Sequence, residues 1–548
     1  MADIDVPVLI IGGGPVGLVL AMELATGGVD CLLVNERQET STHPKGSAIN
    51  CRSMEHLRRL GLAPAVRHVG LPYEHATDSI YVTRLTGYEL GRIVMPSTKE
   101  KIENPGPWGP TLLTPEPIHR CNQMYFEAVF KQHAEQYAET DIRFGWRLLS
   151  FTDYGGHVEA VVEDIGSGEE HTVNCQYLVG CDGANSLVRR QLGVKYGGRS
   201  STGDRFYDGR MMSAYYYAPQ VYGVMAMQPA WHHWTVNPDG RGDVITLDGK
   251  GHFLLLAEVE PGVPFEQFDA RQLFLNAIGA DIDVEVISVM EWTAGLALVT
   301  DKYQVGRVFM AGDSVHLFTP SGGFGFNTGI DDAANLGWKL VAACAGWGGD
   351  RLLETYETER RPIGIRNTSA SGDYAAKIGE MEFPAAIEDD GSEGEAARAS
   401  MRQTVASFTE EFASLGIQLG SRYDGSPLIV GDGTTPPPDD RKTYTPSATP
   451  GGRAPHVWLA DGGSLFDRFG PGFTLLRLGA EPEDVVNFTE EASKRGIPFT
   501  VVDVGEDAVR ELYECRLALI RPDQHIAWRG DAVPEDPGGL WDAVTGRT

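Results

Sequence analysis

The stretch Val6-Pro7-Val8-Leu9-Ile10-Ile11-Gly12-Gly13-Gly14-Pro15-Val16-Gly17 places a glycine-rich turn directly after an apolar run. Leu18 to Thr26 then reads as a helix, and a second apolar run, Cys31 to Asn35, ends beside an acidic residue, Glu36. Strand, turn, helix, strand and acid in this order are typical of a dinucleotide-binding unit. The first glycine permits the turn, the second lets the backbone approach a pyrophosphate, and the third lets helix and strand pack closely. The N-terminus of the helix then faces the phosphates.

This unit predicts a set of residues that contact the cofactor. They are Gly12, Gly14, Pro15, Val16, Gly17, Glu36 and Arg37. Glu36 is placed to accept hydrogen bonds from the hydroxyls of a ribose. The motif alone predicts a dinucleotide and does not separate FAD from NAD.

Composition indicates an ordinary globular enzyme of two or three domains. The 548 residues are 42% hydrophobic and 22% charged, with a net charge of -30. Such a surface repels phosphate backbones and anionic lipid, so we expect neither nucleic acid nor membrane as a partner. The seven cysteines include no Cys-x-x-Cys pair, which favours free thiols in a reducing cytoplasm and no metal site. The apolar segment from Val6 to Met22 is interrupted by its glycines and follows acidic residues, so it predicts neither a membrane span nor a signal peptide.

The rest of the chain divides into three segments that differ in composition and predicted structure. Residues 80 to 300 alternate short β-rich runs with turns, which predicts a mostly antiparallel sheet inserted into the dinucleotide domain. Residues 420 to 455 contain Pro436-Pro437-Pro438 and read as a linker. Three apolar runs follow within about a hundred residues, which fits a small α/β domain.

Three further motifs carry a family resemblance. They are Tyr177-Leu178-Val179-Gly180-Cys181-Asp182-Gly183, Gly306-Arg307-Val308-Phe309-Met310-Ala311-Gly312-Asp313, and Pro320-Ser321-Gly322-Gly323-Phe324-Gly325-Phe326-Asn327. In this order they resemble the fingerprints of class A flavoprotein aromatic hydroxylases, over roughly residues 5 to 375. The chain is most similar to the branch of phenol hydroxylase and 2,4-dichlorophenol 6-monooxygenase.

The resemblance implies an α/β (overall α+β) fold with three parts. They are a Rossmann-like FAD-binding domain, an inserted antiparallel-sheet substrate domain and a thioredoxin-like C-terminal domain without Cys-x-x-Cys. We expect the FAD-binding domain at 1–80, 121–195 and 301–415, where it includes further helices. We expect the substrate sheet at 81–120 and 196–300, the linker at 416–455, and the C-terminal domain at 456–548. Without a second cysteine this last domain cannot exchange dithiols, so Cys515 is expected to be inert and the domain structural.

The family pattern also implies further FAD contacts. They are Arg52, Gln123, Asp182, Gly312, Asp313, Pro320, Gly323, Gly325, Phe326 and Asn327. Asp313 matches the family's ligand for the ribityl chain, and the helix that begins near Phe326 can turn its positive end toward the flavin. Other interpretations stay open: Asp182 as a cap for the helix at Ser186, Arg52 as a surface charge, Gln123 as a polar helix start and Asp313 as an N-cap.

The residues that act on the substrate are harder to predict from the sequence. We take His232, His233, Asp208, Tyr217 and Pro320 as catalytic candidates. The branch places an acid or histidine base a few positions before Arg52, where this chain has Ser47, and this departure leaves the base undefined.

The resulting hypothesis is an enzyme with non-covalently bound FAD. It uses NAD(P)H and O2, through a C4a-hydroperoxyflavin, to hydroxylate a small phenolic or related aromatic substrate, and it is expected to form a dimer or larger homo-oligomer. Baeyer–Villiger or epoxidising chemistry on the same scaffold is one alternative, and a non-catalytic flavoprotein that binds aromatic compounds is another. The Trp-x-Trp-x-Ile-Pro run of flavin halogenases is absent.

Overall fold

An eight-stranded sheet carries the glycine-rich turn at its centre. The computed structural model describes residues 3–103, 112–201, 208–259, 263–479 and 484–548. The strand order β16-β17-β8-β1-β2-β5 places β1 (Asp3–Ile11) between β2 (Cys31–Asn35) and β8 (Glu169–Gly180), parallel to both. The remaining strands are β5 (Thr140–Phe144), β6 (Trp146–Asp153), β7 (Val158–Asp164), β16 (Gln304–Val305) and β17 (Val308–Met310). Stretches far apart in the sequence therefore build one Rossmann-like sheet.

Helices cover this sheet closely. The second half of β1, residues 8–11, is entirely apolar and buried on both faces, as is usual for parallel strands. α1 (Pro15–Thr26) packs against α9 (Gly325–Cys344), where a Cβ added to Gly337 would lie 2.5 Å from Glu23 Cβ. The other helices of this layer are α2 (Cys51–Arg59), α3 (Ala63–Arg67), α5 (Gln123–Ala134) and α6 (Leu187–Gln191).

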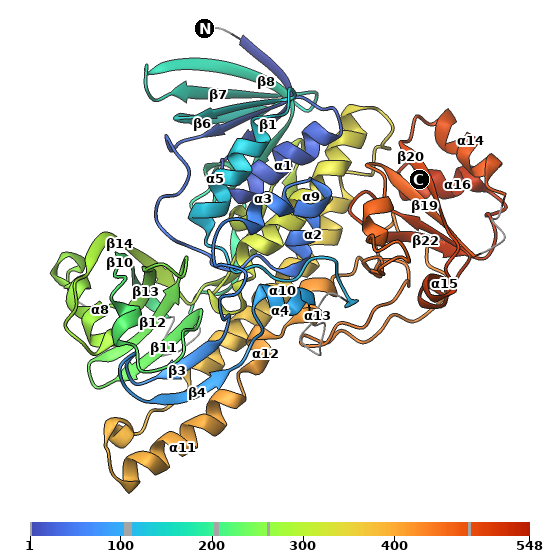
Figure 1. Ribbon diagram of the computed structural model, residues 1–548. Helices are drawn as coiled ribbons and strands as arrows, with labels where there is room; N and C mark the ends of the chain where they lie inside the picture. The colour runs from blue at the N-terminus through green and yellow to red at the C-terminus, as the bar shows by residue number, and fades with distance from the viewer. Residues whose placement is uncertain (1–2, 104–111, 202–207, 260–262, 480–483) are drawn as a thin grey trace.

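A second, seven-stranded sheet forms a separate lobe (Figure 1). Its order is β14-β10-β13-β12-β11-β3-β4, antiparallel except for the β11–β3 pair. The strands are β3 (Ser79–Val82), β4 (Glu89–Ile93), β10 (Gly209–Tyr217), β11 (His232–Asn237), β12 (Gly240–Thr246), β13 (His252–Glu258) and β14 (Glu285–Ala294). The short strands β9 (Tyr196–Arg199), β15 (Ala297–Thr300) and β18 (His316–Leu317) form a third sheet in the order β18-β15-β9.

Alternation along the strands gives the second sheet two different buried faces. Met212, Ala214 and Tyr216 of β10 pack toward α8 (Ala270–Ile278), whereas Met211 and Tyr215 point to the opposite side. Ala48, from the flavin-domain loop after β2, packs in the same cluster as Met211 and Tyr215. Because the family resemblance implies that this part of the first domain holds the flavin, we call this side the flavin-facing side.

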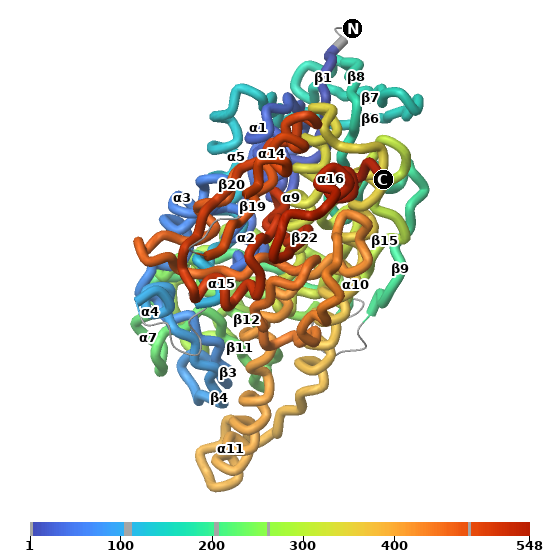
Figure 2. Tube along the Cα trace, turned by 90° about the vertical axis from the view of Figure 1, so that its right-hand side faces the viewer, coloured from blue at the N-terminus to red at the C-terminus, as the bar shows by residue number. Residues whose placement is uncertain are grey.

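A helical arm closes the lower end of the molecule in Figures 1 and 2. α10 (Thr355–Gly379) leads into α11 (Ser392–Ala406), α12 (Thr409–Phe412) and α13 (Leu415–Leu419). Two acidic residues, Glu393 and Glu395, lie in the first turn of α11. Negative charge is favourable there because the helix dipole is positive at its N-terminus.

The C-terminal domain has a four-stranded sheet in the order β20-β19-β21-β22, with a thioredoxin-like arrangement. Its elements are β19 (Phe473–Leu478), α14 (Val486–Lys494), β20 (Phe499–Val504), α15 (Asp507–Tyr513), β21 (Leu517–Ile520), β22 (Ile526–Gly530) and α16 (Pro537–Val544). Figures 1 and 2 show this domain beside α2 and α9. Cys515 is buried within it, and burial raises the pKa of its thiol to about 12.

Buried ion pairs join this domain to the FAD-binding domain. Glu359 of α10 accepts hydrogen bonds from Arg521 at 2.7 and 2.8 Å and from Lys339 of α9 at 2.7 Å. The three side chains are fully buried. Glu55 of α2 binds Arg453 in the same way, and these pairs hold the pKa of Glu55 down at about 2 despite its burial. The C-terminal domain is therefore fixed to the rest of the protein by ion pairs in which both partners are buried.

Candidate active site

The turn after β1 is shaped to leave its backbone open. Gly12 has φ of +110°, and a Cβ there would lie 2.3 Å from the carbonyl oxygen of Cys181. A Cβ on Gly17 would lie 2.0 Å from the Gly12 oxygen, so only glycine fits at either position. Gly14, the N-cap of α1, has nothing within 4 Å of where its Cβ would be and provides no side-chain cap. With Pro15 at N1, the first turn of α1 offers uncapped N–H groups to an anion.

The end of β2 lies next to this turn. Asn35 Oδ1 accepts a hydrogen bond from the Gly13 N–H at 3.0 Å and so fixes the loop. Glu36 and Arg37 follow and are exposed. A carboxylate held at a strand end beside an open helix N-terminus is where a ribose hydroxyl pair would be bound.

Asp182, after β8, has a divided role. One carboxylate oxygen accepts hydrogen bonds from the N–H groups of Leu187 at 2.7 Å and Val188 at 3.2 Å, at the start of α6. Ser186 caps the same helix through the Arg189 N–H. The capping interpretation is therefore correct, and the other oxygen of Asp182 is buried without a partner.

Asp313 lies in the turn Gly312–Ser314, where Gly312 has φ of +66°. The residue is exposed to solvent, yet surrounding protein displaces enough water to raise the pKa of its carboxyl, an effect that His316 and Lys45 oppose. Lys45 is likewise exposed, and protein around it lowers its pKa while Asp313 raises it. A solvent-accessible carboxylate and ammonium that act on one another suit a polyol with many hydroxyls.

The glycine loop before α9 forms the next wall of the site. Pro320 starts the turn, its carbonyl accepts the Gly323 N–H at 3.0 Å, and both Gly322 and Gly323 have positive φ. Gly325 begins α9, which has no side-chain cap. Asn327 holds the loop by donating to the carbonyls of Ala48 at 2.9 Å and Gly323 at 2.6 Å.

Phe326 turns its ring away from this loop. The ring packs against Phe126 of α5, with centroids 5.1 Å apart, and against Gly46. What Phe326 can offer a ligand is therefore its backbone N–H, in the uncapped first turn of α9.

These features fit FAD. The uncapped start of α1 suits a pyrophosphate, and the exposed carboxylates of Glu36 and Asp313 suit ribose and ribityl hydroxyls. The side-chain-free glycine loop suits a flat ring, and the positive end of α9 suits the ring edge that gains electrons on reduction.

Two predicted FAD ligands have other partners. Arg52 is buried and donates to Glu55 at 2.8 Å, to Gln524 at 2.8 Å and to the Asp523 carbonyl at 2.6 Å. Its guanidinium serves the C-terminal domain interface rather than a pyrophosphate, because four acceptors converge on it there, Asp331 being the fourth at 3.6 Å. The interpretation of Arg52 as a surface charge is equally incorrect.

Gln123 occupies the first position of α5 and uses its amide nitrogen to bind Glu127 at 2.6 Å. Its backbone N–H donates to Gly46, in the loop before α2. The side chain is half-buried, and its amide oxygen is the group left for a ligand.

The catalytic candidates do not converge. His232 lies on the flavin-facing side, stacked on Trp231 at 4.6 Å and 2.9 Å from Asp243. His233 is opposite Val244 and Ile80, on the α8 side, where burial lowers its pKa to about 3. Because neighbouring residues of a strand face opposite ways, the two histidines cannot share one site.

Asp208 and Tyr217 lie at opposite ends of β10, which spans Gly209–Tyr217. At about 3.3 Å per residue the two are roughly 30 Å apart. Asp208 accepts a hydrogen bond from Ser201 at 2.6 Å, and the ring of Tyr217 lies 4.9 Å from His252. At most one of the two can reach a ring bound at the glycine loop.

Glu411 of α12 is a functional candidate that sequence reasoning missed. It is buried and accepts the Gly322 N–H at 3.1 Å, while its second oxygen is buried without a partner. The Ser321 hydroxyl is also buried, and it is close enough to the Glu411 carboxyl to lower its pKa, against the larger effect of burial. Burial raises the pKa of Glu411 to about 7. In the sequence it lies in an acidic arm more than eighty residues after the glycine loop, so no local pattern connects the two.

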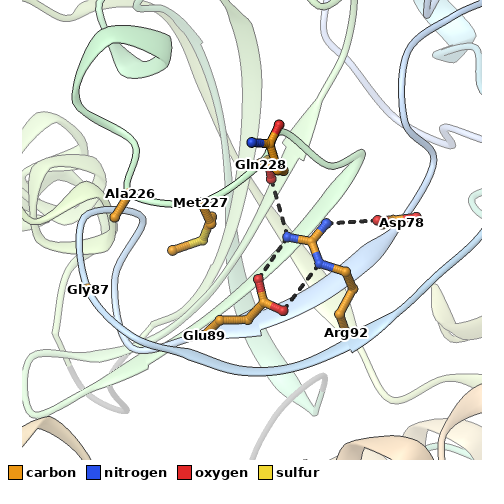
Figure 3. A pocket seen from close by; sticks show the side chains of 7 residues that line it. All are labelled: Asp78, Gly87, Glu89, Arg92, Ala226, Met227 and Gln228. Atoms are coloured by element: carbon orange, nitrogen blue, oxygen red, sulfur yellow. Dashed lines mark hydrogen bonds and ion pairs between the residues drawn. The ribbon is translucent and has the colours of Figure 1, made fainter.

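A surface hollow of about 560 Å³ lies between the β3–β4 hairpin and residues 226–228 (Figure 3). Arg92 in its wall donates to Asp78 at 2.7 Å, Glu89 at 2.8 Å and the Gln228 carbonyl at 3.3 Å. Its guanidinium is therefore satisfied by the protein, and we assign the hollow no role.

Over the described ranges, no cluster of three or more His, Cys, Asp or Glu side chains is arranged to hold a metal ion. Within the same residues, no helix is both long and apolar enough to cross a membrane.

Comparison with known proteins gives two family matches. Residues 5–371 match the model of an FAD binding domain, and residues 447–546 match the C-terminal domain of aromatic-ring hydroxylases. A putative polyketide hydroxylase from Streptomyces halstedii is 32% identical over 97% of this chain and 94% of its own length. The 2,4-dichlorophenol 6-monooxygenase of Delftia acidovorans is 30% identical over 98% and 96%. Among solved structures, the rebeccamycin biosynthetic enzyme RebC with reduced flavin has a TM-score of 0.90 at 35% identity, with full coverage of both chains.

Proposed function

The chain belongs to the FAD-dependent aromatic-ring hydroxylases, and on this premise we propose that it hydroxylates a phenol-like ring of a polycyclic substrate. The protein is a flavin-dependent monooxygenase with FAD as its cofactor. We further propose NAD(P)H as the electron donor and O2 as the source of the inserted oxygen atom. The family likeness supports both co-substrates.

The observation that supports this function best is the junction at Ala48. Its carbonyl is bound by Asn327 at the glycine loop, and its side chain packs in the cluster of the flavin-facing side. A flat cofactor ring on the loop would therefore lie directly beside an apolar, aromatic-rich wall. Such a wall orients a substrate ring and excludes water, which would otherwise divert the oxidant.

When bound, FAD supplies the oxygen-activating chemistry, and the protein supplies orientation, a dry site and proton control. The wall includes Tyr81 and Trp234, whose rings stack 5.6 Å apart, and Trp231. These buried rings are packed against one another and form a rigid apolar boundary for a substrate of several fused rings. The polyketide hydroxylase likeness points the same way.

A phenol reacts faster as its phenolate, so the site needs a base. We propose Glu411 for this role. One oxygen of its carboxyl accepts the Gly322 N–H of the loop, the other oxygen has no hydrogen-bond partner, and a pKa near 7 lets the group accept a proton at neutral pH. Glu411 would then act as the base that the family branch has a few positions before Arg52, where this chain has Ser47.

For the cofactor we propose contacts with the glycine turn, Glu36, Asp182, Asp313 and the glycine loop. The full proposed set is Gly12, Gly14, Pro15, Val16, Gly17, Glu36, Arg37, Asp182, Gly312, Asp313, Pro320, Gly323, Gly325, Phe326 and Asn327. Arg52 is no longer included, and Gln123 is retained only for its amide oxygen.

The test is a substrate screen with the purified yellow protein. Phenols of one to four fused rings are assayed for stimulated NAD(P)H oxidation and, in parallel, for conversion to a hydroxylated product. We expect coupled product formation to improve with ring number. NAD(P)H oxidation without product for every phenol would reject hydroxylation, and a ketone converted to an ester would assign Baeyer–Villiger chemistry instead. Binding without NAD(P)H oxidation would indicate a non-catalytic flavoprotein.

A further inference from the structure

Arg120 is a buried arginine without a carboxylate partner. It precedes α5 and is 5% exposed. Its single hydrogen-bond contact with described residues is a weak one, from Nη2 to the sulfur of Met95 at 3.6 Å, and its Nε is buried without an acceptor. No Asp or Glu within the described ranges forms an ion pair with it. Buried charges in proteins are normally paired, because removing one from water is costly.

Other arginines of this protein show the usual pattern. Arg92 in Figure 3 has two carboxylates and a carbonyl around its guanidinium, although it is less buried than Arg120. Arg521 and Arg453 each bind buried carboxylates. The lone position of Arg120 is therefore a local exception that calls for a ligand.

The charge of Arg120 is retained at neutral pH. Burial lowers its pKa to about 9, so the guanidinium is still positive at pH 7. Two titratable groups interact with it electrostatically, the Cys51 thiol and the Lys101 ammonium. Burial raises the pKa of Cys51 to about 12, so this thiol stays neutral and offers no counter-charge. Lys101 adds positive character rather than neutralising it.

Arg120 belongs to the flavin-facing side. Its guanidinium carbon lies 3.8 Å from the ring centroid of Trp231, and both Trp231 and Met95 pack in the cluster that contains Ala48. The neighbouring His119 pairs through its backbone with Ile49, the residue after Ala48. The opposite edge of this aromatic group is His232, stacked on Trp231. The cation–π contact with Trp231 compensates only part of the lost hydration.

We propose that Arg120 binds an anionic oxygen group of the aromatic substrate, either a carboxylate or the phenolate of an acidic hydroxyl. This inference rests on the proposed function, since it assigns the flavin-facing side to the substrate. A guanidinium presents parallel N–H donors that match a carboxylate and also bind a single phenolate oxygen. The unpaired cation then acts as a selectivity device, because a neutral ring leaves it unsatisfied and an anionic ring does not.

The experiment measures binding to the FAD-loaded protein, independently of turnover. Dissociation constants are determined by calorimetry for 2-naphthoate, for its neutral isostere 2-naphthamide, and for a nitro-substituted naphthol at pH values on either side of its hydroxyl pKa. The variants are Arg120→Met, which keeps length but removes the charge, and Arg120→Lys, which restores it. Arg210→Met is the matched control, since Arg210 lies in β10 of the seven-stranded sheet but is part-exposed and paired with Glu291.

We expect the wild type and Arg210→Met to prefer at least one anionic probe over its neutral form by tenfold or more. Arg120→Met should lose this preference while binding 2-naphthamide at least as well, and Arg120→Lys should recover part of it. A preference for naphthoate alone assigns a carboxylate, and a preference for the ionised naphthol alone assigns a phenolate. Absence of any preference in the wild type, including failure of all probes to bind at millimolar concentration, overturns the proposal, as does a preference that survives in Arg120→Met. Product formation in the phenol screen is scored separately, so loss of the anion subsite would leave hydroxylation standing.

Discussion

Replacing Glu359 with glutamine should loosen the C-terminal domain from the FAD-binding domain. Glu359 is the shared acceptor for Arg521 and Lys339, all three side chains being fully buried. The glutamine keeps the shape but removes the negative charge. Asp523, 2.6 Å from Arg521, would then be the remaining carboxylate in direct contact with this pair.

The size of the effect follows from burial. Removing one partner of a buried ion pair costs about 3–5 kcal/mol, because an uncompensated charge stays in the interior. Unfolding entropy is about 2.1 cal/mol/K per residue. If all 548 residues melt together, the melting temperature should fall by roughly 3–4 °C. If about a hundred residues of the C-terminal domain melt alone, the fall should be roughly 15–25 °C.

Calorimetry distinguishes these two cases, since separate melting gives two transitions. Glu163→Gln is the control, because its partner Arg147 is 46% exposed and such pairs contribute about 0–1 kcal/mol. The ion pair holds the pKa of Glu359 well below its ordinary value. Its stabilisation is therefore complete above the unfolded pKa of about 4.3 and shrinks as pH falls below it. A Glu359→Gln protein that melts like Glu163→Gln at pH 7 would refute the reasoning.

Three further predictions concern the cofactor, the lone thiol and the proposed base. Glu36→Ala and Asp313→Ala should each weaken FAD binding by about 1.5–3 kcal/mol, seen as reduced flavin content and a higher dissociation constant; full occupancy in both would remove them from the site. Cys515→Ala should leave hydroxylation rates unchanged, because a single buried thiol with a pKa near 12 cannot cycle; loss of turnover would make the domain catalytic. The raised pKa of Glu411 means that its contribution to stability is full below about pH 4.5 and is lost as pH rises through about 7. Glu411→Gln should therefore gain about 3 kcal/mol over wild type between pH 5 and pH 8 in urea unfolding, whereas the half-buried neighbour Glu410→Gln should not; equal curves would disprove the shift.

The sequence was most informative where chemistry is local. Gly12, Gly14 and Gly17 belong to one turn, so their spacing in the sequence is enough to predict where the backbone needs glycine. The cap at Asp182 was foreseen as one interpretation for the same reason. The sequence alone also indicated the inserted sheet, because its strands are short β-rich runs separated by turns.

Sites assembled across the fold were not predictable in the same way. His232 and His233 were taken together, but the register of β11 turns them to opposite sides. Asp208 and Tyr217 share a strand whose length separates them. Arg52 was assigned to the pyrophosphate from the family resemblance, and nothing in the sequence links it to its partners Gln524 and Asp523, which lie more than 470 positions later.

Glu411 and Arg120 show the limit most clearly. Glu411 lies 89 positions after Gly322, and no local motif connects the two. Arg120 is a candidate because no carboxylate among the described residues pairs with its guanidinium. A missing partner of this kind cannot be recognised from the sequence. Both depend on burial, which follows from tertiary packing.

The most direct test of flavin-dependent aromatic hydroxylation is oxygen labelling. We would incubate the FAD-loaded protein with NAD(P)H and the best phenol of the size series under 18O2 in unlabelled water. The mass of the product is then measured by mass spectrometry. The account predicts one labelled oxygen atom per product molecule, on a ring carbon, with formation that requires both FAD and NAD(P)H. A product whose new oxygen comes from water, or NAD(P)H oxidation that yields only hydrogen peroxide with every phenol tested, would contradict it.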